Sequence, residues 1–285
     1  MRRRLAGIVL ATVLAVPAGA VAPTDREAAR AGAAWLEGLS IGTVGQQADA
    51  IVALAATGRP RATLRARLAR MTAAAPAYAS TAGGAGKVVL ATVAAGRNPR
   101  SLGGVNYVAR IRAQYAGGRY GVSAYDQAYA ILALRAAGEP VPRPAITALR
   151  NTRAGGGWGF TLSRSGRDDV SVTGLLIQAS RSAGVPATDP MLRQATAWLL
   201  AQRNPSGGYN IAGAGKPTEA NSTAIAICAL RAMGRAPSPS TRLALRSLQE
   251  SDGGFRFTRE VRESRLFATL DAVLALSGRR LPPPY

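Results

Sequence analysis

The sequence predicts an all-α protein in which about six helical hairpins, each with an outer and an inner helix, close into an α/α toroid. Three observations predict this architecture. An alanine- and leucine-rich phrase ending in glycine recurs six times, a more polar helical segment lies between successive copies, and the period-2 alternation of β-strands is missing. Hairpins of this kind bury their apolar faces only by stacking on one another.

The chain begins with a segment typical of an export signal. Three arginines, Arg2 to Arg4, precede an apolar run from Leu5 to Val16, and small residues follow at Ala18 to Ala20. The apolar run is shorter than the roughly 20 residues that a membrane-spanning helix needs. We therefore expect residues 1–20 to be a signal peptide and residues 21–285 to be a single α/α-toroid domain, secreted or otherwise extracytoplasmic.

The repeat units are marked by glycines that we expect to end a helix in the left-handed conformation. These glycines are Gly58, Gly96, Gly138, Gly184, Gly234 and Gly278. The phrase before each, such as 131–137, is apolar on nearly all sides and predicts a buried inner helix. The segment 193–202 has mixed polar and apolar faces, which predicts a half-solvated outer helix.

Two adjacent glycines and an aromatic residue mark the turn from outer to inner helix in the last four units. The four turns are Gly117–Tyr120, Gly156–Trp158, Gly207–Tyr209 and Gly253–Phe255. Paired glycines permit positive φ angles, and the aromatic side chain is expected to cover the turn. A second interpretation is that Trp158, Tyr209 and Phe255 contact a ligand, so these three remain candidate binding residues.

The composition excludes several chemistries. The chain has no histidine and one cysteine, Cys228, so it has no Ser-His-Asp triad, no Cys–His pair and no imidazole zinc site. We therefore expect no metal and no cofactor. Cys228 lies in an apolar run, which predicts a buried packing residue rather than a reactive thiol.

The charge is strongly positive, and this points to an anionic partner. The formal net charge of +21 becomes +18 when the three arginines of the signal peptide are removed. Such a surface attracts polyanions, which for an exported protein are an anionic cell-wall polymer or a membrane surface. The arginines are scattered without a run beyond the signal peptide, so we do not expect a nucleic-acid partner.

The last glycine turn carries a resemblance to a known family. The segment 248–255, with Gln249, Asp252 and Phe255, resembles the glutamine–aspartate–glycine–aromatic repeat of terpenoid cyclase and protein prenyltransferase toroids. The segment 204–209 is a looser copy, and Asp168–Asp169 resembles the acidic start of an inner helix in those families. The resemblance implies their toroid and is weak in the first two units.

The motifs for catalysis in those families are incomplete here. The nearest stretch to the Asp-x-Asp-Asp acid motif of class II terpenoid cyclases is 166–169, with glycine where the first aspartate belongs. Protein prenyltransferases hold zinc with a histidine that this chain lacks. The Gly-Cys-Gly-Glu-Gln motif of complement-type thioester toroids is also missing.

Three carboxylates share one position in the repeat. Asp169, Glu219 and Glu263 each lie fifteen residues before a closing glycine, near the expected start of an inner helix at one mouth of the barrel. Acids there cap helices and complement the helix dipole. Alternatively, two facing carboxylates hydrolyse a glycoside. The full set of candidate ligand-binding residues is Asp126, Trp158, Asp168, Asp169, Tyr209, Glu219, Phe255 and Glu263.

Three functions remain open at this point. The first is an exported, non-catalytic module that binds an apolar or glycan ligand, or a partner, at the toroid mouth. The second is a terpenoid cyclase-like or prenyltransferase-like enzyme that acts on an isoprenoid through Asp168–Asp169. The third is a cell-wall glycoside hydrolase or lyase that uses the mouth carboxylates. The missing catalytic motifs favour the first, and the volume and lining of the barrel centre discriminate among them.

Overall fold

The computed structural model describes residues 23–153, 155–165, 167–279 and 281. Thirteen α-helices and no strand lie within these residues, which confirms the predicted all-α class. In the described part of the chain, no helix combines the length and apolar character needed to cross a membrane. The predicted signal peptide, residues 1–20, lies outside the described residues.

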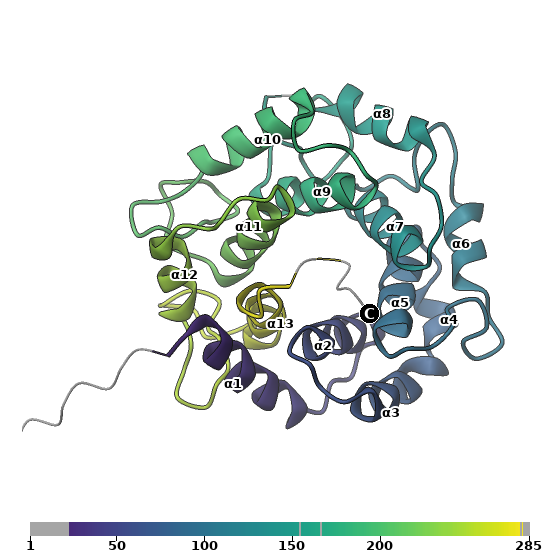
Figure 1. The fold of residues 1–285 in the computed structure, drawn as a ribbon, viewed down its shortest axis with the longest axis horizontal. Helices are drawn as coiled ribbons and strands as arrows, with labels where there is room; N and C mark the ends of the chain where they lie inside the picture. The colour runs from purple at the N-terminus through teal and green to yellow at the C-terminus, as the bar shows by residue number, and fades with distance from the viewer. Residues whose placement is uncertain (1–22, 154, 166, 280, 282–285) are drawn as a thin grey trace, which may run out of the picture.

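Six parallel inner helices form a closed ring (Figure 1). They are α2 (Val44–Ala56), α5 (Ala82–Ala94), α7 (Ala124–Ala136), α9 (Val170–Ser182), α11 (Ala220–Ala232) and α13 (Arg265–Leu276). Each inner helix packs against the next one along the chain, and α13 packs against α2. The predicted toroid is therefore confirmed, and the first two units take part in the ring.

The remaining helices form an outer layer around this ring (Figure 1). They are α1 (Asp25–Glu37), α3 (Arg61–Thr72), α4 (Ala75–Tyr78), α6 (Tyr107–Ala113), α8 (Arg143–Thr152), α10 (Pro190–Ala201) and α12 (Pro239–Arg246). Each outer element precedes its inner helix, as the sequence predicts. The outer element of the second unit is divided into α3 and the short α4.

The last unit packs directly on the first. The Phe255 ring lies against Gly32 of α1, where a Cβ atom would come within 3.3 Å of the ring. Gln249 donates a hydrogen bond of 2.8 Å to the carbonyl of Ala28. Asp25 accepts hydrogen bonds from two arginines of α12. These contacts join segments more than 200 residues apart in sequence and close the ring.

The inner helices end as the sequence predicts. All six closing glycines have positive φ angles, between 65° and 90°. Arg135, Arg181 and Arg231 occupy equivalent positions three residues before their closing glycines. Each donates to a carbonyl in the last turn of the next inner helix. A cation at a helix C-terminus complements the helix dipole. Part of the high arginine content therefore has a structural role.

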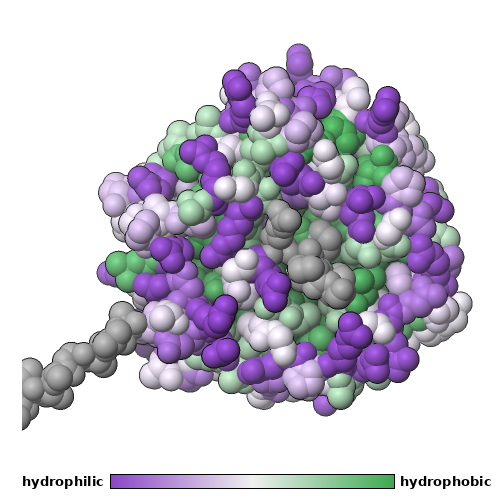
Figure 2. Space-filling model, in the orientation of Figure 1, coloured by the Kyte–Doolittle hydropathy of each residue, from purple (hydrophilic) through white to green (hydrophobic). Residues whose placement is uncertain are grey.

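The two ends of the barrel differ. The connections that enter α9, α11 and α13 are longer than those that leave α7, α9 and α11. Long connections on a rigid scaffold are where binding residues are usually found. Figure 2 shows the end of the barrel where the inner helices finish, which is opposite to the end with the long connections. Hydrophilic residues are spread around this face. We call the end where the inner helices begin the entry end.

Candidate functional site

Three neighbouring inner helices place polar side chains at the same level of the barrel. Asp49 on α2, Lys87 on α5 and Tyr129 on α7 each lie nine residues before a closing glycine. The Lys87 Nζ lies 2.7 Å from Asp49 Oδ2 and 5.0 Å from the centre of the Tyr129 ring. Burial disfavours the ammonium ion, but Tyr129 and Asp49 together raise the pKa of Lys87 above its ordinary value. Lys87 is therefore held as a cation.

Asp271 on α13 and Asn221 on α11 lie near this group. We call the five residues, Asp49, Lys87, Tyr129, Asn221 and Asp271, the central cluster. The Asn221 side-chain amide donates a hydrogen bond of 2.6 Å to Asp271 Oδ2. Burial raises the pKa of Asp271 to about 7, and the nearby Asp49 and Glu219 add to the rise, against the opposing effects of Asn221 and Lys87. The side-chain oxygen of Asn221, Oδ1, is buried and has no hydrogen-bond partner among the described residues.

The cavity at the central cluster is small. Its volume is about 40 Å³, and Asp49, Lys87, Tyr129 and Asp271 form its polar wall. The other side is apolar and is formed by Val52, Ala53, Leu90, Leu270, Leu274 and Leu281. A cavity of this size holds water molecules but not a terpenoid or a sugar ring.

Aromatic side chains lead from the central cluster toward the entry end. Tyr125 stacks on Tyr129 with ring centres 6.4 Å apart, and Phe160 packs on Tyr125 at 5.8 Å. Burial raises the pKa of Tyr125 to about 12, and the carboxylates of Asp169 and Asp271 add to this effect. The Tyr125 hydroxyl therefore stays neutral and can donate a hydrogen bond.

Two of the predicted carboxylates hold the backbone. Asp126 accepts hydrogen bonds from the Gly83 N–H at 2.9 Å and from the Ser123 hydroxyl at 2.6 Å. Asp168 accepts from the N–H of Gly157, in the glycine turn of its own unit, at 2.9 Å. Asp126 therefore joins the starts of α5 and α7, and Asp168 holds the glycine turn to the residues that precede α9.

The structure brings Asp169 and Glu219 near each other and leaves Glu263 apart. Asp169 caps α9 through the Val172 N–H at 2.9 Å. Glu219 is buried and accepts from the Ile211 N–H at 3.2 Å. Burial raises the pKa of both carboxyl groups, and the charge of Asp169 adds to the rise at Glu219. Glu263 is exposed and has no side-chain partner among the described residues.

The three aromatic candidates lie inside the wall of the toroid. Trp158, Tyr209 and Phe255 are at most 1% exposed. The main-chain N–H of each donates to a threonine hydroxyl of the following inner helix. The acceptors, in the same order, are Thr173 at 2.8 Å, Thr223 at 2.9 Å and Thr269 at 2.8 Å. These aromatics therefore fasten the turn to the inner helix, and none of them faces open space.

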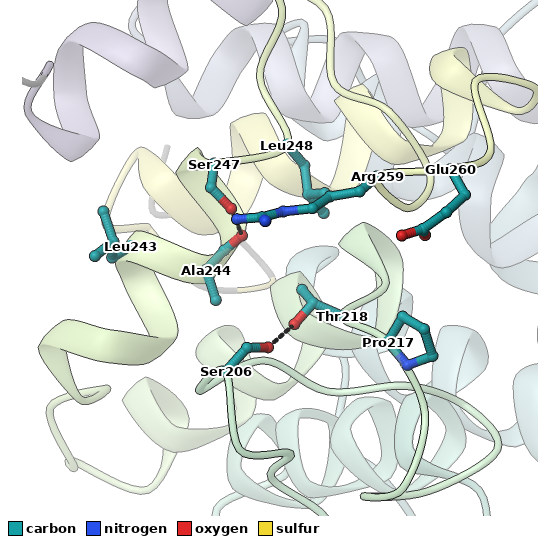
Figure 3. A pocket seen from close by; sticks show the side chains of 9 residues that line it. All are labelled: Ser206, Pro217, Thr218, Leu243, Ala244, Ser247, Leu248, Arg259 and Glu260. Carbon is teal, nitrogen blue, oxygen red and sulfur yellow. Dashed lines mark hydrogen bonds between the residues drawn. The ribbon is translucent and has the colours of Figure 1, made fainter.

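A larger cavity of about 270 Å³ lies on the outer wall, between α12 and the connections that enter α11 and α13 (Figure 3). The hydroxyls of Ser206 and Thr218 point toward each other across 2.7 Å. Leu243 and Leu248 supply apolar surface, and Arg259 lies across the cavity. This cavity offers apolar contacts, one cation and one carboxylate, that of Glu260.

The described residues contain no metal-binding group of three or more His, Cys, Asp or Glu side chains. Cys228 is buried, and burial raises the pKa of its thiol to about 12. The thiolate is therefore scarce near neutral pH. Within the part of the chain that the structure describes, neither a metal centre nor a thiol nucleophile is formed.

Sequence reasoning missed the central cluster, although a signal was present. Asp49, Lys87 and Asp271 each interrupt an otherwise apolar inner-helix phrase. A charged residue inside a buried helix needs a partner. The common distance of Asp49 and Lys87 from their closing glycines places them at one level, so aligning the repeats by those glycines would have paired them.

Comparison with known proteins supports the fold. Neither a protein-family model nor a curated protein sequence matches the chain. The type II terpene cyclase MstE from Scytonema is similar, with a TM-score of 0.60 and 15% identity over 89% of this chain and 97% of that one. The ent-copalyl diphosphate synthase from Streptomyces platensis gives a TM-score of 0.53 and 18% identity over 82% of this chain and 50% of that one.

A carbohydrate-active enzyme shares the architecture. The unsaturated glucuronyl hydrolase from Bacillus sp. GL1 gives a TM-score of 0.56 and 12% identity over 81% of this chain and 84% of that one. Identities this low establish the fold and leave the activity open. The chain therefore has a terpenoid-cyclase-like α/α-toroid fold, which it shares with other helical-barrel enzymes.

Proposed function

We propose that the chain is an exported, non-catalytic binding module whose ligand enters the barrel at the entry end. The observation that carries this proposal is the occupied barrel centre, where the Lys87–Asp49 ion pair and Tyr129 border a cavity of only about 40 Å³. Ligand pockets for small molecules have volumes of roughly 300–1,000 Å³. A ligand is therefore held above the central cluster rather than within it.

An isoprenoid cyclase fits this geometry less well. Such an enzyme encloses a long apolar substrate and presents a free acid to it. The family resemblance suggests Asp168 and Asp169 as acids, but Oδ2 of Asp168 binds the Gly157 N–H and Asp169 caps α9. The remaining oxygen of Asp168, Oδ1, is buried without a partner among the described residues. The Lys87–Asp49 ion pair also makes one wall of the barrel centre polar, where an apolar substrate would need apolar contacts.

A glycoside hydrolase or lyase also fits less well. A hydrolase needs two carboxyl groups facing one space, roughly 5 to 9.5 Å apart. Asp169 and Glu219 are bound to main-chain N–H groups, and Asp49 is paired with Lys87. Asp271 has a pKa near neutrality, but the two carboxylates that act on it among the described residues, Asp49 and Glu219, are bound to Lys87 and to the Ile211 N–H. The arrangement supports binding rather than bond cleavage.

Side chains of the central cluster and those between it and the entry end suggest the chemistry of the ligand. The buried oxygen of Asn221 that has no partner among the described residues would accept a hydrogen bond from a ligand. Tyr125 and Phe160 offer aromatic surface between the central cluster and the entry end. An apolar molecule with a hydroxyl group, or a sugar that stacks on the rings, matches both features.

A combined turnover and binding experiment tests the proposal. The mature chain is incubated with polyprenyl substrates and with wall glycans, products are sought by mass spectrometry, and binding is followed by thermal shift and calorimetry. We expect a thermal shift with a member of one class and no product. Asn221→Ala should weaken binding, whereas Asn151→Ala, at an exposed position on α8, should leave it unchanged.

Two results would contradict the proposal. Product formation that Asp271→Asn abolishes would make the protein an enzyme, and flat thermal shifts with every ligand would remove the small-ligand function. Export is tested separately by the N-terminus of the protein recovered outside the cytoplasm, which should be Val21. An intact Met1 in the cytoplasmic fraction alone would refute it.

A further inference from the structure

Exposed apolar side chains gather at the entry end of the barrel. Among the described residues, six large apolar side chains are exposed, and five of them lie at this end. We call these five the apolar rim: Val122, Phe160, Ile211, Val261 and Phe267. The sixth, Leu243, lies on the outer helix α12. Single exposed apolar residues are ordinary, but their concentration on one surface indicates an interaction site.

Hydrogen bonds fix two rim residues above the start of α7. Val122 directly precedes Ser123, the N-cap residue of α7, and is 83% exposed. The carbonyl of Phe160 accepts a hydrogen bond of 2.8 Å from the Ala124 N–H, so its side chain stands above the same helix. Phe160 is 61% exposed even though its ring contacts Tyr125.

The other rim residues belong to the last two units. Ile211 is bound through its N–H to Glu219, which directly precedes α11. Phe267 lies in the first turn of α13, and Val261 lies in the connection that enters this helix. The rim therefore extends over the starts of α7, α11 and α13, around a large part of the ring (Figure 1).

Cations are interleaved with the rim. The connections that enter α7, α9, α11 and α13 carry exposed basic side chains without a carboxylate partner among the described residues. These are Arg119, Arg164, Arg167, Lys216 and Arg259. The exposed acids of the same connections are fewer and include Glu260 and Glu263. The entry end is therefore both apolar and positively charged.

This combination distinguishes between two kinds of anionic partner. A charged wall polymer would pair with the cations but would leave the apolar rim in water. A bilayer with anionic lipids satisfies both, because apolar side chains enter the interfacial region while cations contact lipid phosphates. We propose that the entry end docks the protein on an anionic lipid bilayer. This inference goes beyond the proposed function and holds for any ligand of the barrel.

Vesicle flotation tests the inference with the mature chain. Vesicles of phosphatidylcholine are compared with vesicles that also contain phosphatidylglycerol, and we expect binding only to the second. The double variant Phe160→Ser with Phe267→Ser should lose affinity by about tenfold or more, because two exposed aromatic rings no longer enter the lipid. Leu243→Ser, an equally exposed apolar residue outside the rim, is the matched control and should bind as the parent does.

Charge variants separate the two contributions. Lys216→Gln and Arg259→Gln should each lower the affinity about fivefold, since a basic residue near an anionic bilayer contributes about 1 kcal/mol. Circular dichroism confirms that each variant is folded. Absence of vesicle binding would overturn the proposal. Binding that persists in the double phenylalanine variant and is competed by a soluble anionic polymer would overturn it in favour of a wall polymer.

Discussion

Asp271 gives the sharpest test of the barrel centre, through its effect on stability against pH. Burial raises its pKa in the folded protein to about 7, whereas an aspartate in an unfolded chain has a pKa of about 3.9. Between these values the unfolded chain releases the proton and the folded protein keeps it. The free energy of unfolding therefore falls as the pH rises from about 4 to about 7. Asp271→Asn should remove this dependence.

The size of the effect follows from the shift. Each pKa unit corresponds to about 1.4 kcal/mol, so about three units give an upper value of about 4 kcal/mol. Asp271 keeps some contact with solvent, which reduces this value, and we expect about 2 to 4 kcal/mol. The variant keeps an acceptor for the Asn221 amide, because asparagine retains a carbonyl oxygen.

Urea unfolding of the parent and Asp271→Asn, measured across this pH range, gives the comparison. The difference in unfolding free energy should shift in favour of the variant as the pH rises. Asp189→Asn is the control, because the Arg150 side chain lowers the pKa of Asp189 and confines its titration to lower pH. Parallel profiles for the parent and Asp271→Asn would mean that Asp271 ionises as it does in the unfolded chain, which would refute the description of the central cluster.

Three further predictions concern the wall of the toroid. Thr173→Val leaves the buried Trp158 N–H without its acceptor and should lower the unfolding free energy by about 1 to 3 kcal/mol. Thr147→Val, at an exposed position, should have little effect. Equal effects of the two variants would contradict the role of the Thr173 hydroxyl. Phe255→Ala should lower the free energy of unfolding in urea by about 3 to 5 kcal/mol, because it leaves a cavity at the junction between the last and first units. A decrease below about 1 kcal/mol would argue against a closed ring. Cys228 should not react with a thiol reagent until the protein unfolds, since burial raises its pKa to about 12, and rapid labelling of the folded protein would show that the site is open.

Local features of the repeat were predictable because they depend on neighbouring residues. The closing glycines need a left-handed conformation, and all six adopt it. The position of Asp169 predicts a cap, and the side chain caps α9. The glycine turns predict aromatic residues that cover them, and Trp158 and its counterparts are buried there. In each case the cause lies within one hairpin.

The candidate site was less predictable, because it depends on contacts between units. The Lys87–Asp49 pair joins α5 to α2, and the Asn221–Asp271 hydrogen bond joins α11 to α13. The spacing of the repeat predicted a site at the carboxylates Asp169, Glu219 and Glu263 instead. Of these, Asp169 and Glu219 came near each other, but both accept hydrogen bonds from main-chain N–H groups, and Glu219 also accepts one from the Ser222 hydroxyl.

The sequence by itself determined the hairpins: their number, the order of outer and inner helix, and the residues that end each helix. These properties follow from apolar periodicity and from the backbone preferences of glycine, which act over a few residues. Only the tertiary structure decided that the ring closes and that Asp49, Lys87, Tyr129 and Asp271 meet at its centre. An inner helix is apolar on almost every side, so its pattern does not fix its rotation. Packing against both neighbours sets that rotation, and with it the side chains that face the axis.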